Sequence, residues 1–261
     1  MIRIRPRAAL TLTLASAAGL AMFLWPLLLQ PATSTAAHRT DSPMLFVLLL
    51  PALVAVIVAE LSDGGIDSKA LAMLGVLAAL GAALRPLGAG TAGIETVFFL
   101  LILAGRVYGA GFGFVLGAVT LFASALLTGG VGPWLPFQML ASGWVGLGAG
   151  FLPRAKGKLE LALLAVYGAF AAYAFGFLLN LWFWPFAIGP EGPLSYVPGG
   201  SVATNLTHFF RYCLATSTWG WDTVRAVTNV VAICAAGPVL LGAMRRAARK
   251  AAFDAPVTFS A

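Results

Sequence analysis

Long apolar stretches separated by short polar connections run along the whole chain. The apolar stretches lie near residues 8–29, 44–60, 69–86, 93–106, 109–128, 135–152, 159–185 and 221–244. Because about 17–25 helical residues cross the hydrocarbon core of a bilayer, these stretches predict eight membrane helices. The sequence therefore predicts an all-α fold, a polytopic transmembrane helical bundle.

The fourth stretch, 93–106, is short for a full crossing, and we expect it to be tilted or partly re-entrant. Glu95 and Arg106 flank this helix. They lie about 16 Å apart along it, too far to pair with each other, so each is expected to anchor its own interface.

Basic side chains mark one side of the predicted bundle. With the N-terminus in the cytoplasm and eight crossings, the cytoplasmic ends collect Arg3, Arg5, Arg7, Lys69, Arg106, Arg154, Lys156, Lys158, Arg245, Arg246, Arg249 and Lys250. The other side keeps Arg39, Arg85, Arg211 and Arg225. Since cytoplasmic connections carry an excess of Lys and Arg, this bias predicts that both termini are cytoplasmic. The first apolar stretch is longer than that of a usual secretory signal, so we expect an uncleaved anchor helix.

The composition narrows the function classes. The chain of 261 residues is 60% hydrophobic and only 10% charged, which excludes an ordinary soluble domain. Its net charge of +7 comes from short clusters between apolar stretches, so we expect no nucleic-acid partner. No GxxxxGK(S/T), GxSxG or HExxH motif occurs, and no enzyme activity is predicted. Cys213 and Cys234 are far apart, and His38 and His208 lie in different loops, so we expect no metal or other cofactor.

Glycines, prolines and aromatic residues gather in the connections on the opposite, outer side. The segment GGVGPWLPFQ at 129–138 contains Pro133 and Pro136, which predicts a stiff turn that ends where Pro136 opens the next helix. Aromatic rings together with a few polar groups predict a small-ligand pocket. The candidate substrate-binding residues are Trp134, Phe137, Gln138, Asn180, Trp184, Tyr196, His208, Arg211, Trp219 and Trp221. For any single ring, an interfacial aromatic belt is an equally good interpretation.

Small residues form a stripe in the helix predicted at 69–86. Gly75, Ala79 and Ala83 are four residues apart, with Ala78 and Ala82 one step round the helix. Small side chains at this spacing let two helices approach closely in lipid. The stripe predicts a helix contact, either within the chain or with another subunit.

Two longer segments are distinctive: FFLLILAGRVYGAGFGFVLGAVTLFASALLTGG and, above all, GPWLPFQMLASGWVGLGAGFLP. Together with six helices and the small-residue stripe, they make residues 69 to about 250 resemble the substrate-binding S component of energy-coupling factor (ECF) transporters, in particular actinobacterial members. The resemblance implies a six-helix core at 63–250, preceded by two extra membrane helices at 1–62 and followed by a cytoplasmic tail at 251–261.

The resemblance also implies a function. Such S components capture a vitamin or related micronutrient outside a bacterial cell and dock on a transmembrane coupling subunit driven by two ATPase subunits. An alanine-rich helix makes the coupling contact in the family, which here corresponds to Gly75, Ala78, Ala79, Ala82 and Ala83. The ligand is expected under the loops at 85–94, 128–135 and 186–220. Cobalamin is the first candidate substrate, with thiamin, riboflavin, biotin and a queuosine precursor as alternatives.

Two other functions stay open from the residues alone. A membrane scaffold or assembly protein would use the outer aromatics against lipid or protein, and it would bind no small molecule. An integral membrane enzyme acting on lipid would need titratable groups at one interface, where only Asp222, His208 and Glu191 are available. The binding module is the function that the sequence favours.

Overall fold

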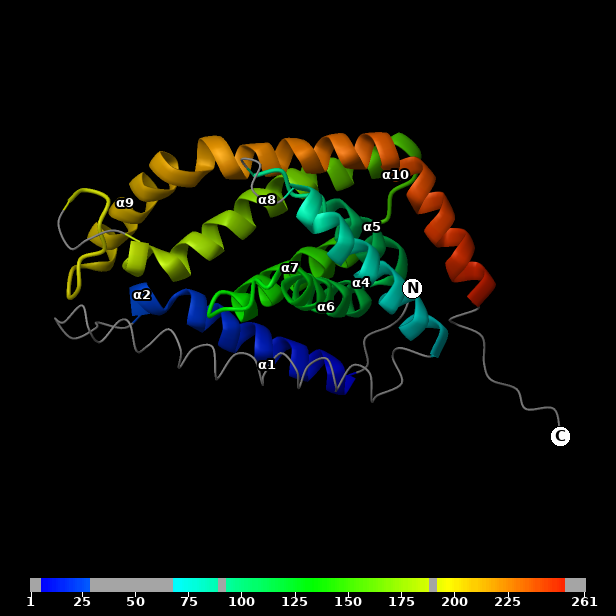
Figure 1. Ribbon diagram of the computed structural model, residues 1–261, viewed down its shortest axis with the longest axis horizontal. Helices are drawn as coiled ribbons and strands as arrows, with labels where there is room; N and C mark the ends of the chain where they lie inside the picture. Colours follow the sequence, from blue (N-terminus) through cyan, green and yellow to red (C-terminus); the bar gives the residue numbers. More distant parts are fainter. Residues whose placement is uncertain (1–5, 29–67, 89–92, 188–191, 252–261) are drawn as a thin grey trace.

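The computed structural model describes residues 6–28, 68–88, 93–187 and 192–251, which form a bundle of helices with no strand among them (Figure 1). The elements are α1 (Pro6–Phe23), α2 (Trp25–Leu28), α4 (Ser68–Gly88), α5 (Phe98–Tyr108), α6 (Ala110–Thr128), α7 (Leu135–Phe151), α8 (Gly157–Ala187), α9 (Val202–Cys213), η1 (Leu214–Asp222) and α10 (Thr223–Ala251). The predicted all-α, polytopic bundle is confirmed. The apolar segment predicted at 44–60 lies outside the described residues.

Five described helical stretches are long and apolar enough to cross a membrane. They are Pro6–Phe23, Ser68–Gly88, Ala110–Thr128, Gly157–Ala187 and Val202–Lys250. Helix α5 is shorter and equally apolar, in agreement with the short fourth helix of the sequence analysis. It begins at Phe98 and ends at Tyr108 rather than spanning 93–106.

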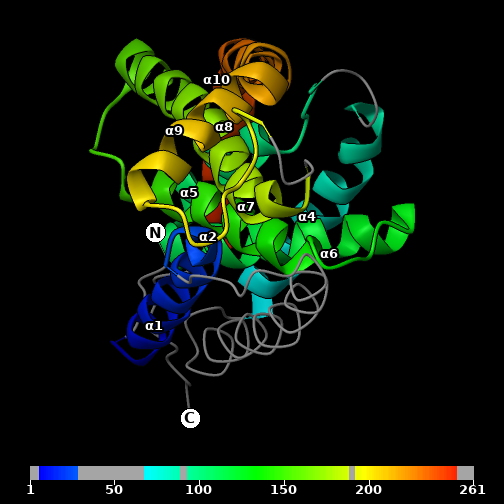
Figure 2. The ribbon, with the colours of Figure 1, turned by 90° about the vertical axis from the view of Figure 1, so that its left-hand side faces the viewer.

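Helix α5 is almost wholly buried by its neighbours. It packs against α6, α7 and α10, while α6 packs in turn on α4 and α7. Figure 2 shows α8 and α10 on one side of this core and α4 and α6 on the other. Every α5 residue except Phe99 is buried, because a helix that is apolar on all faces is stable only when protein or lipid covers each of them.

Two helical stretches are longer than a bilayer is thick. Helix α8 has 31 residues and the continuous stretch Val202–Lys250 has 49, so at 1.5 Å per residue they measure about 46 and 74 Å. A hydrocarbon core is about 30 Å thick. Both stretches therefore extend beyond the core, and Figure 1 shows α9 beside the far end of α8.

The prediction of a long loop at 186–220 is wrong for residues 202–220, which are helical. Ser201 caps α9 by accepting a hydrogen bond from the Thr204 backbone N–H. The buried side of α9 includes Phe209 and Tyr212, and Phe209 lies 5.4 Å from the Trp184 ring of α8. Half of this amphipathic helix is polar, so its mean hydropathy was too low to predict a membrane helix from the sequence.

The turn predicted at 129–138 is present between α6 and α7. Gly129, with φ +65°, ends α6, and α7 begins at Leu135 with Pro136 in its first turn. The Trp134 indole N–H donates to the Gly130 carbonyl at 3.3 Å. The ring therefore lies back over its own turn.

The small residues of α4 lie on two faces. Ala78 and Ala82 are buried against the bundle, whereas Gly75, Ala79 and Ala83 are exposed. A side chain added at Gly75 would meet no atom of the described residues within 4 Å. One part of the stripe therefore packs within the chain, and the other part faces outward.

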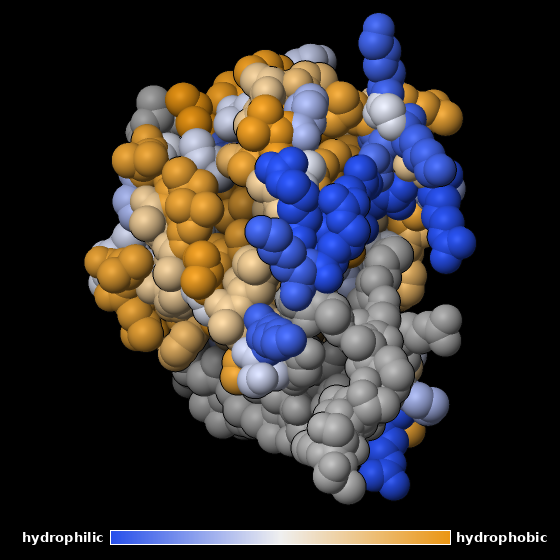
Figure 3. Space-filling view, turned by 90° about the vertical axis from the view of Figure 1, so that its right-hand side faces the viewer, coloured by the Kyte–Doolittle hydropathy of each residue, from blue (hydrophilic) through white to orange (hydrophobic). Residues whose placement is uncertain are grey.

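One end of the bundle, here called the basic end, carries the cations of the α7–α8 connection and of the last turns of α10. They are Arg154, Lys156, Lys158, Arg245, Arg246, Arg249 and Lys250. Figure 3 looks onto this end and shows hydrophilic residues gathered beside apolar flanks. Figure 1 shows α10 changing direction in its second half, which contains Pro238, a residue that cannot donate the helical hydrogen bond.

A buried ion network ties three helices together at the basic end. Arg106 of α5 donates from Nε to Glu160 Oε1 at 2.7 Å, and Arg245 of α10 donates to the same oxygen at 2.6 Å. Arg106 also donates to the Leu152 carbonyl at 2.9 Å. The Arg106 side chain thus ties the end of α5 to α8, and this buried ion pair is a role that the sequence analysis did not predict.

Candidate functional site

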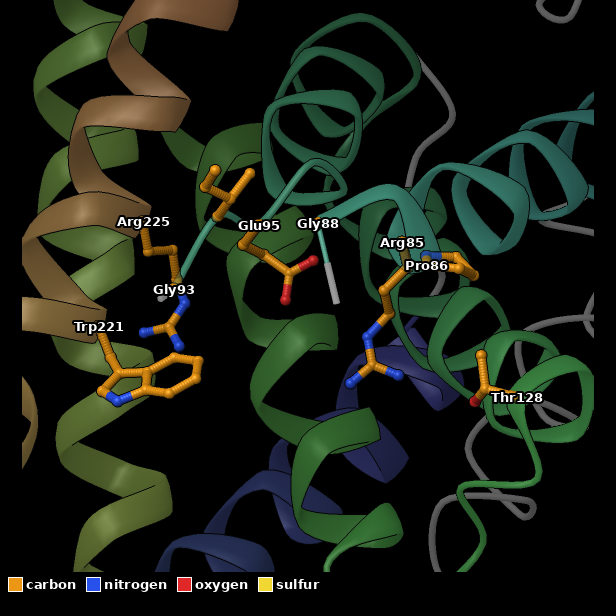
Figure 4. Close-up of a pocket in the computed structure, with 9 residues that line it drawn as sticks. Arg85, Pro86, Gly88, Gly93, Glu95, Thr128, Trp221 and Arg225 are labelled. Carbon is orange, nitrogen blue, oxygen red and sulfur yellow. The ribbon is translucent and has the colours of Figure 1, made fainter. Parts of the chain in front are cut away.

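Two cavities of about 280 Å³ each lie at the end of the bundle opposite the basic end. The first cavity is lined by Arg85, Pro86, Gly88, Gly93, Ile94, Glu95, Thr128, Trp221 and Arg225 (Figure 4). The second cavity is lined by Phe175, Gly176, Leu179, Asn180, Tyr212, Thr216, Ser217, Trp221, Asp222 and Arg225. Because Trp221 and Arg225 line both, the two cavities are neighbours on either side of these side chains.

Arg85 reaches the first cavity from the last turn of α4. Its guanidinium donates to Ser124 Oγ of α6 at 3.5 Å and to Gln138 Oε1 of α7 at 3.4 Å. Both bonds are long and both acceptors are neutral, so they hold the guanidinium weakly. The side chain bridges three helices while its charge stays unpaired by any carboxylate of the described residues.

Glu95 enters the same cavity from the segment between α4 and α5. The Thr96 hydroxyl donates to the Leu84 carbonyl at 2.6 Å, which fixes this segment to α4. Gly93 has φ +91°, and a side chain there would overlap the Trp221 backbone. This glycine therefore allows the segment to lie directly against the end of η1, so that Glu95 and Trp221 line the same cavity.

Burial raises the pKa of the Glu95 carboxyl above its ordinary value, and the positive charges of Arg85 and Arg225 and a hydrogen bond from the Val97 backbone N–H offset part of that rise. No ion pair of Glu95 occurs within the described residues. Removal from water disfavours a carboxylate unless a cation or a donor approaches it closely. The site therefore holds one carboxylate that a ligand donor would stabilise.

Arg225 is held much more firmly than Arg85. Its Nη1 donates to Asp222 Oδ1 at 2.8 Å and to the Ala172 carbonyl at 3.4 Å. The guanidinium carbon lies 5.2 Å from the centre of the Phe175 ring, within the range of a cation–π contact. Arg225 is thus fixed by the protein and forms a wall between the two cavities.

A chain of hydrogen bonds fixes Asp222 from the other side. Asn180 donates to Ser217 Oγ at 2.6 Å, and Ser217 donates to Asp222 Oδ2 at 2.9 Å. Both Asp222 oxygens are therefore occupied, one by Ser217 and one by Arg225. Gly176 of α8 lies directly under this carboxylate, where any larger residue would overlap it.

The segment η1 is π-helical, with the Thr223 N–H bonded to the Thr218 carbonyl five residues earlier. The wider turn sets the directions of the two tryptophans in it. Trp221, 48% exposed, lines both cavities, whereas Trp219, 77% exposed, lines neither. π-Helical turns inside α-helices are often found at functional sites.

Two of the ten predicted substrate-binding residues, Asn180 and Trp221, line these cavities. Gln138 lines neither cavity, but it accepts a hydrogen bond from Arg85, which lines the first. Asn180, Trp221 and Gln138 come from α8, η1 and α7, which are far apart in the sequence.

The other predicted residues lie elsewhere. Phe137 is fully buried between Phe23 and Trp182 in the main core. Trp184 and Tyr196 belong to a second apolar cluster with Leu181, Phe209, Tyr212 and Cys213. Three further residues, Trp134, Arg211 and Trp219, are exposed and outside both linings, and His208 Nδ1 lies 2.8 Å from the Ser195 carbonyl oxygen.

The sequence analysis did not predict Arg85, Glu95 and Arg225 as site residues. It gave Glu95 a role at a membrane interface and counted Arg85 and Arg225 only among the basic residues of the outer side. A signal was present, since a charge beside long apolar helices is costly and is retained where it has a partner or a function. Within the described ranges, no group of three His, Cys, Asp or Glu side chains is arranged to hold a metal ion.

The fold defines a multi-pass membrane protein, and its two neighbouring cavities are lined by polar and apolar side chains. A family model for the substrate-specific component of ECF transporters matches residues 69–209, more than half of the chain. The chain therefore belongs to this family, which implies association with ECF membrane and ATPase components and with a small-molecule substrate. Searches of curated proteins and of solved structures gave no match.

Proposed function

We propose that this chain captures a vitamin-like molecule for an ATP-driven importer and holds it in the cavities around Trp221 and Arg225. The observation that carries the proposal is that residues from α4, α8, η1 and α10 converge there, at the end opposite the basic end. A concave site with apolar walls and a few polar groups is typical of small-molecule binding. In a bacterial cell membrane with the basic end in the cytoplasm, as the charge bias favours, this site opens outward.

The cavity size bears on the substrate. Each cavity, at about 280 Å³, is just below the roughly 300–1,000 Å³ found for pockets that bury drug-sized ligands. Cobalamin, the first candidate from the sequence, is larger than such ligands and would need the Trp221 side chain to move so that the two cavities merge. Thiamin, riboflavin or biotin requires less rearrangement, and we therefore favour a ligand of that size.

The test is native mass spectrometry of the detergent-purified full chain, followed by thermal shift against thiamin, riboflavin, biotin and cobalamin. A ligand that binds the folded state raises the melting temperature in a saturable way. We expect Trp221→Ala to lose this response and Trp219→Ala, at an exposed position outside both linings, to keep it. A flat response of folded wild-type protein across the panel would favour the scaffold function instead.

We further propose that the exposed part of the α4 stripe is where a transmembrane coupling subunit docks, with ATP hydrolysed by two ATPase subunits. Gly75, Ala79 and Ala83 allow another helix to approach closely. Ala79→Leu should reduce co-purification with the coupling and ATPase subunits and leave ligand binding unchanged. Ala235→Leu, at an exposed alanine of α10, is the matched control. Normal co-purification of the Ala79→Leu variant would contradict this docking surface.

A further inference from the structure

The first cavity holds two charged side chains that have no charged partner among the described residues. Arg85 has only its two long bonds to neutral acceptors, and Glu95 forms no ion pair within the described residues. Figure 4 shows the two charged ends pointing into the same cavity from different sides. By contrast, Arg225, which lines the same cavity, is paired with Asp222 at 2.8 Å.

One ligand can form hydrogen bonds with both side chains at once. A guanidinium only donates hydrogen bonds, so it requires an acceptor oxygen or nitrogen. An ionised carboxylate only accepts, so it requires an N–H or O–H donor. Because one donor side chain and one acceptor side chain are both left over, a ligand with acceptors only or donors only would pair with just one of them.

Trp221 supplies the third contact. Its indole ring lies in the first cavity beside Arg225, as Figure 4 shows. A flat ring of a ligand can stack on this indole, and aromatic pairs are stabilised beyond the area that they bury. The cavity therefore combines one flat apolar surface with one donor group and one acceptor group.

We propose that Arg85 and Glu95 determine the specificity of the site, and that the ligand carries an acceptor for Arg85 and an N–H donor for Glu95 on a ring stacked against Trp221. This inference rests on the proposed function, because it names the chemical class of the substrate held in that site. Ring compounds with a neighbouring donor and acceptor belong to this class, whereas anions without an N–H donor and quaternary cations without an acceptor do not.

The binding test uses probes of both kinds on the full purified chain. Riboflavin, biotin and thiamin carry N–H donors and acceptors, nicotinate is a ring anion without an N–H donor, and benzyltrimethylammonium is a ring cation without an acceptor. We expect at least one of the first three to bind and the last two to cause no shift. For that ligand, Arg85→Gln and Glu95→Gln should each weaken Kd by about 10-fold or more, as expected for a lost hydrogen bond to a charged group.

Two further variants keep the binding test interpretable. Arg85→Lys retains the charge but not the fork of donors and should give an intermediate loss. Arg211→Gln changes an exposed arginine outside both cavity linings and should leave Kd unchanged. Binding that survives both Arg85→Gln and Glu95→Gln, or binding of nicotinate alone, would overturn the inference while leaving the proposed function standing.

A second test needs no ligand. If Arg85 and Glu95 serve a ligand, the melting temperatures of ligand-free Arg85→Gln and Glu95→Gln should stay within about 2 °C of wild type. If they form a structural pair, each single variant should melt several degrees lower, and the double variant should recover part of the loss. That second pattern refutes the inference even if no probe binds, whereas a flat probe response of wild-type protein counts against the proposed function.

Discussion

The two ends of the bundle differ in how their buried and half-buried charged side chains are paired. At the basic end, one Glu160 oxygen accepts hydrogen bonds from Arg106 and Arg245 at 2.7 and 2.6 Å, and the carboxylate is almost fully buried. At the cavity end, Arg85 has only long bonds to neutral groups and Glu95 has no ion pair among the described residues. The charges at the basic end are therefore paired by the protein itself, whereas we propose that a ligand pairs with those at the cavity end.

This difference separates structural charge from functional charge. A buried ion pair with short bonds is costly to break because the remaining partner is left unpaired. In contrast, a charged side chain whose partner is a ligand contributes little to the free energy of folding of the ligand-free protein. Replacing such a side chain should therefore change stability little. The same residue types, Arg and Glu, therefore have different roles that only their surroundings reveal.

The largest effect is expected at the basic end. Glu160→Gln removes the one carboxylate that serves both Arg106 and Arg245. We expect a loss of about 3–5 kcal/mol in the free energy of unfolding, measured by SDS titration in mixed micelles. Arg154→Gln, at an exposed residue of the same end, is the control and should change stability by less than about 0.5 kcal/mol. Equal stability of Glu160→Gln and wild type would show that the network is not structural.

A smaller effect is expected where the protein fixes Arg225. Gly176→Ala places a methyl group against the Asp222 carboxylate and displaces it from Arg225. We expect a loss of about 1–3 kcal/mol in the free energy of unfolding, together with weaker ligand binding in thermal shift. Gly75→Ala, at a helical position with open space, should instead gain about 0.5–1 kcal/mol. Unchanged stability and binding for Gly176→Ala would mean that Asp222 does not need its present position.

The smallest effect is expected from the titration of Glu95. Burial raises its folded-state pKa above 4.5, so the folded protein binds this proton more tightly than the unfolded chain. The resulting destabilisation is fully present above the folded pKa and disappears as the pH falls to 4.5. As the pH is lowered through this window, the melting temperature of wild-type protein should therefore rise more than that of Glu95→Gln. Parallel pH profiles of the two proteins would show that the half-buried Glu95 carboxyl does not have a raised pKa.

Much of the architecture could be predicted from the chain. Runs of apolar residues placed α4, α6, α7 and α8 within a few residues of their observed bounds, because bilayer thickness fixes how long such a run must be. The turn before Pro136 followed from local backbone chemistry. Helix α9 was missed because its polar face lowers its mean hydropathy, and its helical form depends on packing against α8.

The candidate site was predicted only in part. Asn180 and Trp221 were named as ligand contacts and do line cavities, because they are polar or aromatic residues beside long apolar stretches. Trp184 and Phe137 have the same sequence character but lie in apolar clusters. Residue type and neighbourhood in the sequence do not distinguish these two outcomes, since both give a large aromatic ring near the end of a helix.

The sequence by itself determined the membrane-embedded, all-α character of the chain and its charge bias, because both depend on composition over local windows. The tertiary structure decided which polar and charged side chains contact one another. Arg85 contacts Gln138 from 53 residues away, and Arg106 contacts Glu160 from 54 residues away. Such pairs depend on how helices cross, a property of side-chain packing across the whole bundle that local patterns do not contain.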